Sequence, residues 1–128
     1  ERVAEADSER RRSIHLAGVF ANNFTNQLYA LSGDIMLRAG LSYDMLKPLI
    51  EETALKAIAA TEPRTVQTGP AVRGDEAVMQ SHIQRLSDMP DLQVLYAQIS
   101  KMIMNELKKS FKPEFINRID NIIIFILT

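Results

Sequence analysis

The chain has 128 residues, of which 46% are apolar and 24% charged, and its formal net charge is −1. These values are typical of one ordinary globular domain, and they exclude the global positive field that would attract nucleic acid. The chain has no Cys, which excludes disulfides, thiol catalysis and Cys-based zinc sites. No apolar run approaches the roughly 20 residues of a transmembrane helix, and the charged N-terminal stretch does not resemble a signal peptide. We therefore expect a cytoplasmic protein that binds neither nucleic acid nor membranes.

The pattern predicts a long first helix over Ser8–Arg38. The stretch contains no Pro, and its apolar residues recur at helical spacing. Asp7 or Ser8 can cap its start, and Gly40 can end it in a left-handed conformation. The predicted apolar face consists of Ile14, Ala17, Gly18, Ala21, Phe24, Leu28, Leu31 and Ile35. Because such a helix is about 45 Å long, we expect it to be a central element or an interface element.

A second helix is expected from Ser42, as its cap, to about Ala60. Pro48 lies near its first turn, where a late start or a kink accommodates the missing N–H. The following stretch, TEPRTVQTGPAVRGD, is rich in Pro, Gly and Thr and is predicted to be a loop.

Two further helices are predicted in the second half. Asp75 can cap a helix over Glu76–Leu86, and a fourth helix is expected over Pro90–Lys109. The apolar side of that fourth helix is predicted to carry Leu92, Leu95, Tyr96, Ile99, Ile103 and Leu107.

The last residues of the chain predict a helix followed by a strand. Pro113 suits the first position of a short helix, and Asn121–Thr128 is β-branched and apolar enough for a buried strand. A lone strand leaves its backbone groups unpaired. We expect the strand to pair with a second copy of the chain or to pack against the helices.

Three segments carry a family resemblance: HLAGVFANNF (His15–Phe24), AGLSYDMLKPLI (Ala39–Ile50), and QTGPAVRGD (Gln67–Asp75) followed by HIQRL. They resemble the helical domain that follows a Rossmann domain in oxidoreductase-like proteins related to pyrroline-5-carboxylate reductase and 6-phosphogluconate dehydrogenase. The resemblance covers residues 1–103. It implies a mainly α fold, a helical bundle like the C-terminal domain of 6-phosphogluconate dehydrogenase. In that family the helical domain supplies dimer contacts and one wall of the substrate cleft.

The resemblance, together with the chemistry of the side chains, indicates candidate residues for a substrate wall. A His and two carboxamides on one helix face could hydrogen-bond a substrate or a cofactor amide, and an Arg in a Gly-Pro loop could hold an anion. The alternatives are that His15 and the two Asn residues contact water or neighbouring helices, that Asp75 caps the next helix, and that Arg73 pairs with an acid. The candidates are His15, Asn22, Asn23, Thr68, Gly69, Arg73 and Asp75.

The cofactor that this resemblance implies has no binding motif in the chain. There is no G-x-G-x-x-G sequence after a strand, so NAD(P) is expected only if a Rossmann domain is supplied by the parent protein. The two His residues are far apart in sequence and suggest no metal site.

A second resemblance lies in FKPEFINRIDNIIIF (Phe111–Phe125). The stretch over residues 105–125 resembles the arginine-finger segment of Clp-type AAA+ unfoldases, and Arg118 matches the finger itself. The chain has neither a G-x-x-x-x-G-K-[ST] loop nor an acidic Walker B strand. We therefore expect Arg118 to be inactive and to pair with Asp120 or Glu114, or to be solvated.

The sequence thus predicts a chimera of two parts: a helical dimerisation and substrate-wall domain over residues 1–103, and a Clp-like helix-strand segment over residues 104–128. The favoured function is a non-catalytic helical interaction module, homo-oligomeric through the long first helix, the C-terminal strand or both. One alternative is the substrate-binding half of an NAD(P)-dependent oxidoreductase. A weaker one is an ATPase-related interaction segment.

Overall fold

The computed structural model describes residues 7–106, and every regular element in that range is helical. The mainly α fold expected from the sequence is confirmed. The chain divides into two compact units, with the boundary between Lys56 and Ala57. The predicted C-terminal helix and strand lie outside the described residues. Between residues 7 and 106, no helix is both long enough and apolar enough to cross a membrane.

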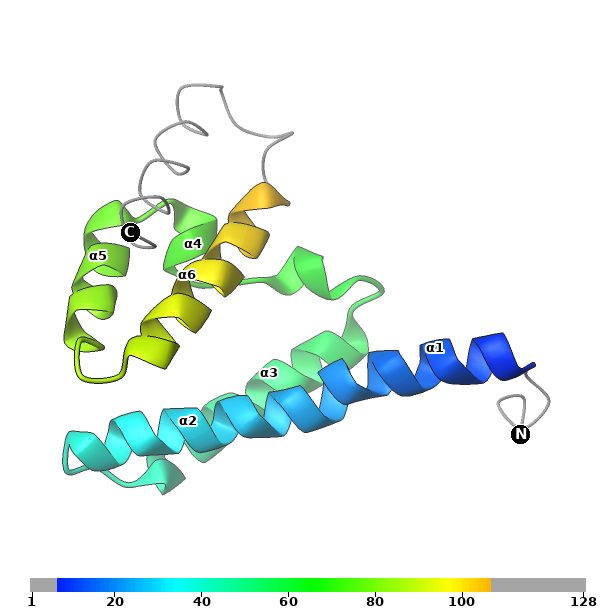
Figure 1. Cartoon of the computed structure of the whole chain (residues 1–128), viewed down its shortest axis with the longest axis horizontal. Helices are drawn as coiled ribbons and strands as arrows, with labels where there is room; N and C mark the ends of the chain where they lie inside the picture. The colour runs from blue at the N-terminus through cyan, green and yellow to red at the C-terminus, as the bar shows by residue number, and fades with distance from the viewer. Residues whose placement is uncertain (1–6, 107–128) are drawn as a thin grey trace. The chain divides into compact units, whose positions relative to one another are not determined.

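The first unit is dominated by one continuous helical rod, drawn in blue to cyan in Figure 1. It consists of α1 (Ser8–Gly18), a π-helical segment η2 (Val19–Phe24) and α2 (Thr25–Arg38). The carboxylate of Asp7 accepts a hydrogen bond from the backbone N–H of Arg10 at 2.8 Å and so caps the start. The predicted long helix is therefore confirmed over its whole length, and the π-helical segment within it was not predicted.

A tight turn ends the rod at the predicted glycine. Gly40 has a φ of +74°, and the N–H of Leu41 reaches back to the carbonyl of Met36 at 2.8 Å. This closure satisfies carbonyl groups that the end of a helix leaves without partners.

The predicted second helix begins later than its cap. Ser42 caps a single 3₁₀ turn, η3 (Tyr43–Leu46), and α3 (Lys47–Ala59) follows it. Pro48 is the second residue of α3, where its missing N–H removes no helical hydrogen bond. The late start expected at Pro48 is thus confirmed.

The second unit begins with a stretch that is more regular than the sequence predicted. The predicted loop contains a 3₁₀ turn, η4 (Pro63–Val66), and a one-turn helix, α4 (Pro70–Arg73). Both begin with Pro, whose fixed φ favours the first helical position. The two glycines that flank α4 have positive φ, +110° at Gly69 and +65° at Gly74, so they start and end this turn where other residues would be strained.

Two longer helices complete the second unit. These are α5 (Glu76–Arg85), capped by the Asp75 carboxylate as predicted, and α6 (Pro90–Asn105). Figure 1 shows α4, α5 and α6 grouped together, and α4 contacts both of the others. The side chain of Gln93 donates a 2.8 Å hydrogen bond to the carbonyl of Ile83, which ties α6 to α5.

The core of the second unit is small and formed partly by small side chains. Met79 is fully buried, and Ala71 and Met104 pack with it. On α6 the fully buried face is Ala97, Ser100 and Met104. The predicted apolar side of this helix was therefore only partly right: Tyr96 and Ile103 pack against the core, but Ile99 is exposed. The buried face of α6 thus includes two small residues, and α4 packs against this helix.

The first unit shows the opposite pattern. None of its described residues, 7–56, is buried. The predicted apolar face of the rod is accordingly not covered, and large apolar side chains are exposed along its length.

Candidate functional site

Four large apolar side chains on the rod are exposed and equally spaced. Leu16, Phe20, Phe24 and Leu28 follow at intervals of four residues and are 62%, 61%, 51% and 42% exposed. The rings of Phe20 and Phe24 meet edge to face, with centroids 4.9 Å apart, so they lie on one side of the rod. We call these four residues the apolar stripe. An exposed apolar row of this kind is typical of surfaces that contact another molecule.

The π-helical segment keeps this stripe straight. In an α-helix a step of four residues overshoots a full turn by about 40°, so three such steps would carry Leu28 about 120° away from Leu16. A π-turn contains more residues than an α-turn. The step from Phe20 to Phe24, inside η2, therefore falls short of a full turn and offsets the drift. The uniform spacing of four was the signal in the sequence that could have predicted it.

Thr25 stands where η2 gives way to α2. Its hydroxyl donates a 2.8 Å hydrogen bond to the carbonyl of Phe20, five residues earlier. Its backbone N–H bonds the carbonyl of Asn22. The hydroxyl thus gives a partner to a carbonyl at the edge of the irregular turn, which supports the π-helical geometry.

Charged side chains lie near both ends of the stripe. Arg12 continues the spacing of four toward the N-terminus and contacts Glu9 at 3.1 Å, with both side chains largely exposed. Asp34 lies near the other end of the rod, is exposed, and forms no ion pair with any residue between 7 and 106. Arg12 therefore continues the line of the stripe, whereas Asp34, six residues after Leu28, lies about 120° around the helix from that line.

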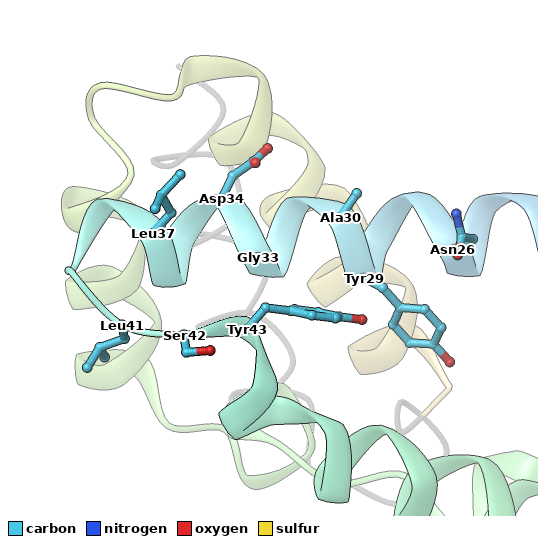
Figure 2. Close-up of a pocket in the computed structure, with 9 residues that line it drawn as sticks. All are labelled: Asn26, Tyr29, Ala30, Gly33, Asp34, Leu37, Leu41, Ser42 and Tyr43. Atoms are coloured by element: carbon cyan, nitrogen blue, oxygen red, sulfur yellow. The ribbon is translucent and has the colours of Figure 1, made fainter.

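An open hollow of about 530 Å³ lies beside α2 in the same unit. Within it the Tyr43 ring packs over Gly33, where an added Cβ would lie 3.4 Å from the ring. Figure 2 shows that Asp34 and Ala30 point to the side of α2 away from Tyr43. The polar groups of the hollow do not converge on one point, so it lacks the arrangement of a small-molecule site.

The predicted wall residues of the first unit lie on the rod. His15, Asn22 and Asn23 are all exposed, and none of their side chains hydrogen-bonds another described residue. This exposure leaves them available to water or to a partner, and their role in a substrate wall stays a prediction.

The predicted wall residues of the second unit flank α4. The Asp75 carboxylate accepts a 3.2 Å hydrogen bond from the N–H of Val78, which confirms its predicted capping role. Arg73 is exposed and forms no ion pair within the described part of the chain. Thr68 is exposed beside Gly69, whose φ of +110° favours glycine. Their substrate-wall role also stays a prediction.

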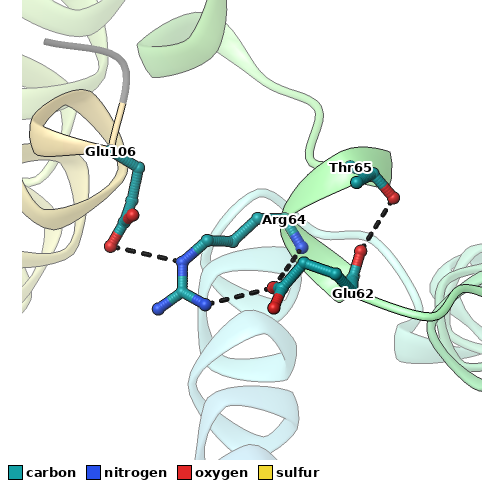
Figure 3. A network of polar contacts seen from close by, with 4 residues as sticks. All are labelled: Glu62, Arg64, Thr65 and Glu106. Carbon is teal, nitrogen blue, oxygen red and sulfur yellow. Dashed lines mark hydrogen bonds and ion pairs between the residues drawn. The ribbon is translucent and has the colours of Figure 1, made fainter. Parts of the chain in front are cut away.

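A polar network orders the stretch before α4. Figure 3 shows the guanidinium of Arg64 between two carboxylates, with Nη1 at 3.1 Å from Glu62 and Nε at 3.2 Å from Glu106. The Glu62 carboxylate also accepts the backbone N–H of Arg64 at 3.1 Å. That N–H, and then the guanidinium, hold the pKa of Glu62 below its ordinary value of 4.5. The network fixes η4 to the end of α6 within the second unit.

One polar pair in the second unit was not predicted from the sequence. Nδ1 of His82 lies 2.8 Å from the hydroxyl of Tyr96, and the two rings meet edge to face. Burial raises the pKa of the Tyr96 phenol above its ordinary value of 10.0. The pair joins α5 to α6, which gives it a structural role.

Two further candidate sites were a metal site and the finger-like arginine. Among residues 7–106 no group of three or more His, Cys, Asp or Glu side chains could hold a metal ion. Arg118, the finger-like residue, lies outside the described range.

Residues 1–103 match the model of a family described as "Domain of unknown function (DUF2520)". A crystal structure from Bacteroides fragilis, described as a "putative NADP oxidoreductase", is 47% identical, with a TM-score of 0.75. That match covers 78% of this chain but 38% of the Bacteroides chain. The helical fold is therefore shared with part of an oxidoreductase-related protein.

Clp ATP-binding subunits match part of the chain. A ClpA homolog from Trieres chinensis is 38% identical over 64 residues, which is 50% of this chain and 7% of that protein. ClpC from Staphylococcus epidermidis is 57% identical over 30 residues, 23% of this chain and 4% of that protein. The chain thus spans a small part of each relative, and the fusion origin inferred from the sequence stays a prediction.

Proposed function

This chain belongs, over residues 1–103, to the DUF2520 family, and from that premise we propose that it is a helical interaction module that joins two copies of itself through the apolar stripe. The module is the helical part of an oxidoreductase-related protein, and by itself it binds rather than catalyses.

The exposure of the apolar stripe carries this proposal. Four large apolar side chains face solvent on one straight rod, in a unit where no described residue is buried. At about 25 cal/mol per Å² of apolar surface, covering such a row favours association strongly. Aromatic side chains at its centre are typical of the residues that contribute most to protein interfaces.

The match to the Bacteroides protein supports the proposal that this module is one part of a larger protein. That protein is described as an NADP oxidoreductase, and this chain spans 38% of it. The helical part then supplies the subunit contact, and the nucleotide-binding chemistry belongs to the remaining part of such a protein.

Phe20→Glu tests the proposal because it places a charge at the centre of the apolar stripe. We expect the variant to dimerise at least about thirtyfold more weakly than the natural chain, since a central aromatic residue contributes about 2 kcal/mol or more. Light scattering at matched concentrations measures the shift toward the 14.4 kDa mass of one chain.

Leu37→Glu is the matched control, because Leu37 is an exposed apolar residue of the same rod that lines the hollow. It should leave the mass unchanged. The proposal fails if Phe20→Glu keeps the oligomeric mass of the natural chain while remaining helical by circular dichroism.

A further inference from the structure

The two units of the chain differ in what holds their helices in place. The second unit buries Ala71, Met79 and Met104 in a core of its own, whereas none of residues 7–56 is buried. We propose that the helices of the first unit are stable only while the apolar stripe is covered, and that the second unit keeps its fold without a cover. The inference takes the identity of the cover, a second copy of the chain, from the proposed function, and it adds that the first unit folds as it associates.

The contacts within the first unit are few in kind and exposed. Lys56 and Glu52 form an ion pair four residues apart in α3, and both side chains are more than half exposed. Exposed pairs of this kind contribute little to stability. The Tyr43 ring joins two elements by packing over Gly33 of α2, but Tyr43 itself is only partly buried. These contacts leave the helices of this unit with little tertiary support.

The contacts of the second unit join separate helices. Gln93 of α6 donates a hydrogen bond to the carbonyl of Ile83 at the end of α5, and His82 of α5 meets Tyr96 of α6. Both bonds lie in partly buried surroundings, where hydrogen bonds are stronger than in water. Together with the core around Met79, they make this unit a region that can stay folded by itself.

The sequence of the rod is a weak helix former. Four of the five residues 22–26 are Asn or Thr, which favour helices weakly, and Gly18 and Gly33 favour them still less. The segment η2 also interrupts the regular ladder of backbone hydrogen bonds. In proteins, most of the stability of a helix comes from the packing of its apolar face. The rod lacks that contribution until its exposed apolar side chains are covered.

This coupling would control the predicted substrate wall. His15, Asn22 and Asn23 lie on α1 and η2, so their spacing exists only while the rod is helical. A ligand that contacts these side chains would therefore bind the associated chain more tightly, and by linkage it would strengthen association by the same factor.

Hydrogen exchange of the full chain, followed by mass spectrometry of its fragments, tests the inference. The natural chain is measured at a concentration at which it associates and again after dilution to the mass of one chain. We expect the amides of α2 to exchange roughly tenfold faster or more after dilution, while those of α6 keep their rate. Phe20→Glu should show the fast exchange in α2 at both concentrations. Leu37→Glu is the control and should follow the natural chain.

The outcomes separate this inference from the function it rests on. If the chain dissociates on dilution and exchange in α2 is unchanged, or rises equally in α2 and α6, the inference is overturned and the proposed function stands. A single chain at every concentration with slow exchange in α2 overturns both. A single chain with fast exchange in α2 and slow exchange in α6 overturns the proposed function and supports the inference.

Gly18→Ala provides a second readout that does not depend on dilution. Gly18 has helical backbone angles, and an added Cβ would meet nothing within 4 Å, so Ala favours the helix there without a clash. Combined with Phe20→Glu, it should slow exchange in α1 roughly threefold to fivefold. Gly40→Ala in the same background is the matched control, because Gly40 has a φ of +74° at which Ala is strained. No slowing by Gly18→Ala, or equal slowing by Gly40→Ala, would contradict the weak helix formation from which the inference is drawn.

Discussion

At the scale of single residues, three carboxylates of this chain cap the starts of helical segments. Asp7, Glu62 and Asp75 each accept a backbone N–H at the beginning of a helical segment. Each bond gives a partner to a backbone N–H that the start of a helix leaves without one. These residues therefore hold the backbone at the helix starts.

Glu62 allows this interpretation to be measured. Because the backbone N–H and then the guanidinium of Arg64 lower its pKa, Arg64→Gln should raise the pKa of Glu62 part of the way toward 4.5. The stabilising contact is fully present above the unfolded value near 4.5 and is lost as the pH falls through the lowered folded value. Titration of the Glu62 carboxyl by NMR measures the shift, with Lys101→Gln as a control. An unchanged pKa in Arg64→Gln would contradict the network of Figure 3.

At the scale of elements, the sequence predicted the helices well where caps and breakers mark them. The ends at Asp7, Gly40 and Asp75 were correct because each depends on a local conformation that one residue type favours. The short helices η4 and α4 were missed because their Pro and Gly content is also typical of loops.

The buried faces were predicted less well than the helices. On α6 the pattern pointed to large apolar residues, but the core seam contains Ala97 and Ser100. Small residues there reflect how closely α4 approaches, which is a property of tertiary packing that periodicity does not encode. On the rod the apolar spacing predicted a helix, but large apolar side chains along it are exposed, because spacing alone does not say which face is buried. The predicted wall residues lie in two separate units, and spacing along the sequence cannot bring them together.

The hydroxyl of Thr25 provides a test of the π-helical segment. Thr25→Val removes the hydrogen bond to the Phe20 carbonyl and should lower the free energy of unfolding by roughly 1 kcal/mol. It should also weaken the dimer, because the apolar stripe loses its alignment. Thr53→Val is the matched control, since Thr53 makes a similar bond to Leu49 in a regular helix. Thermal unfolding and the dimer dissociation constant measure both effects. The same response from both variants would show that η2 has no special role.

At the scale of the whole molecule, the two units differ in how they bury apolar surface. The second unit has its own small core around Met79. The first unit has none among its described residues and presents the apolar stripe instead. A domain cannot leave such a surface in water without loss of stability, so we expect the chain to associate.

Sedimentation equilibrium of the intact chain over a range of concentrations measures this association. We expect a mass of twice 14.4 kDa that falls toward one chain only on dilution. A mass of 14.4 kDa at every concentration, with the helical content intact, would contradict it.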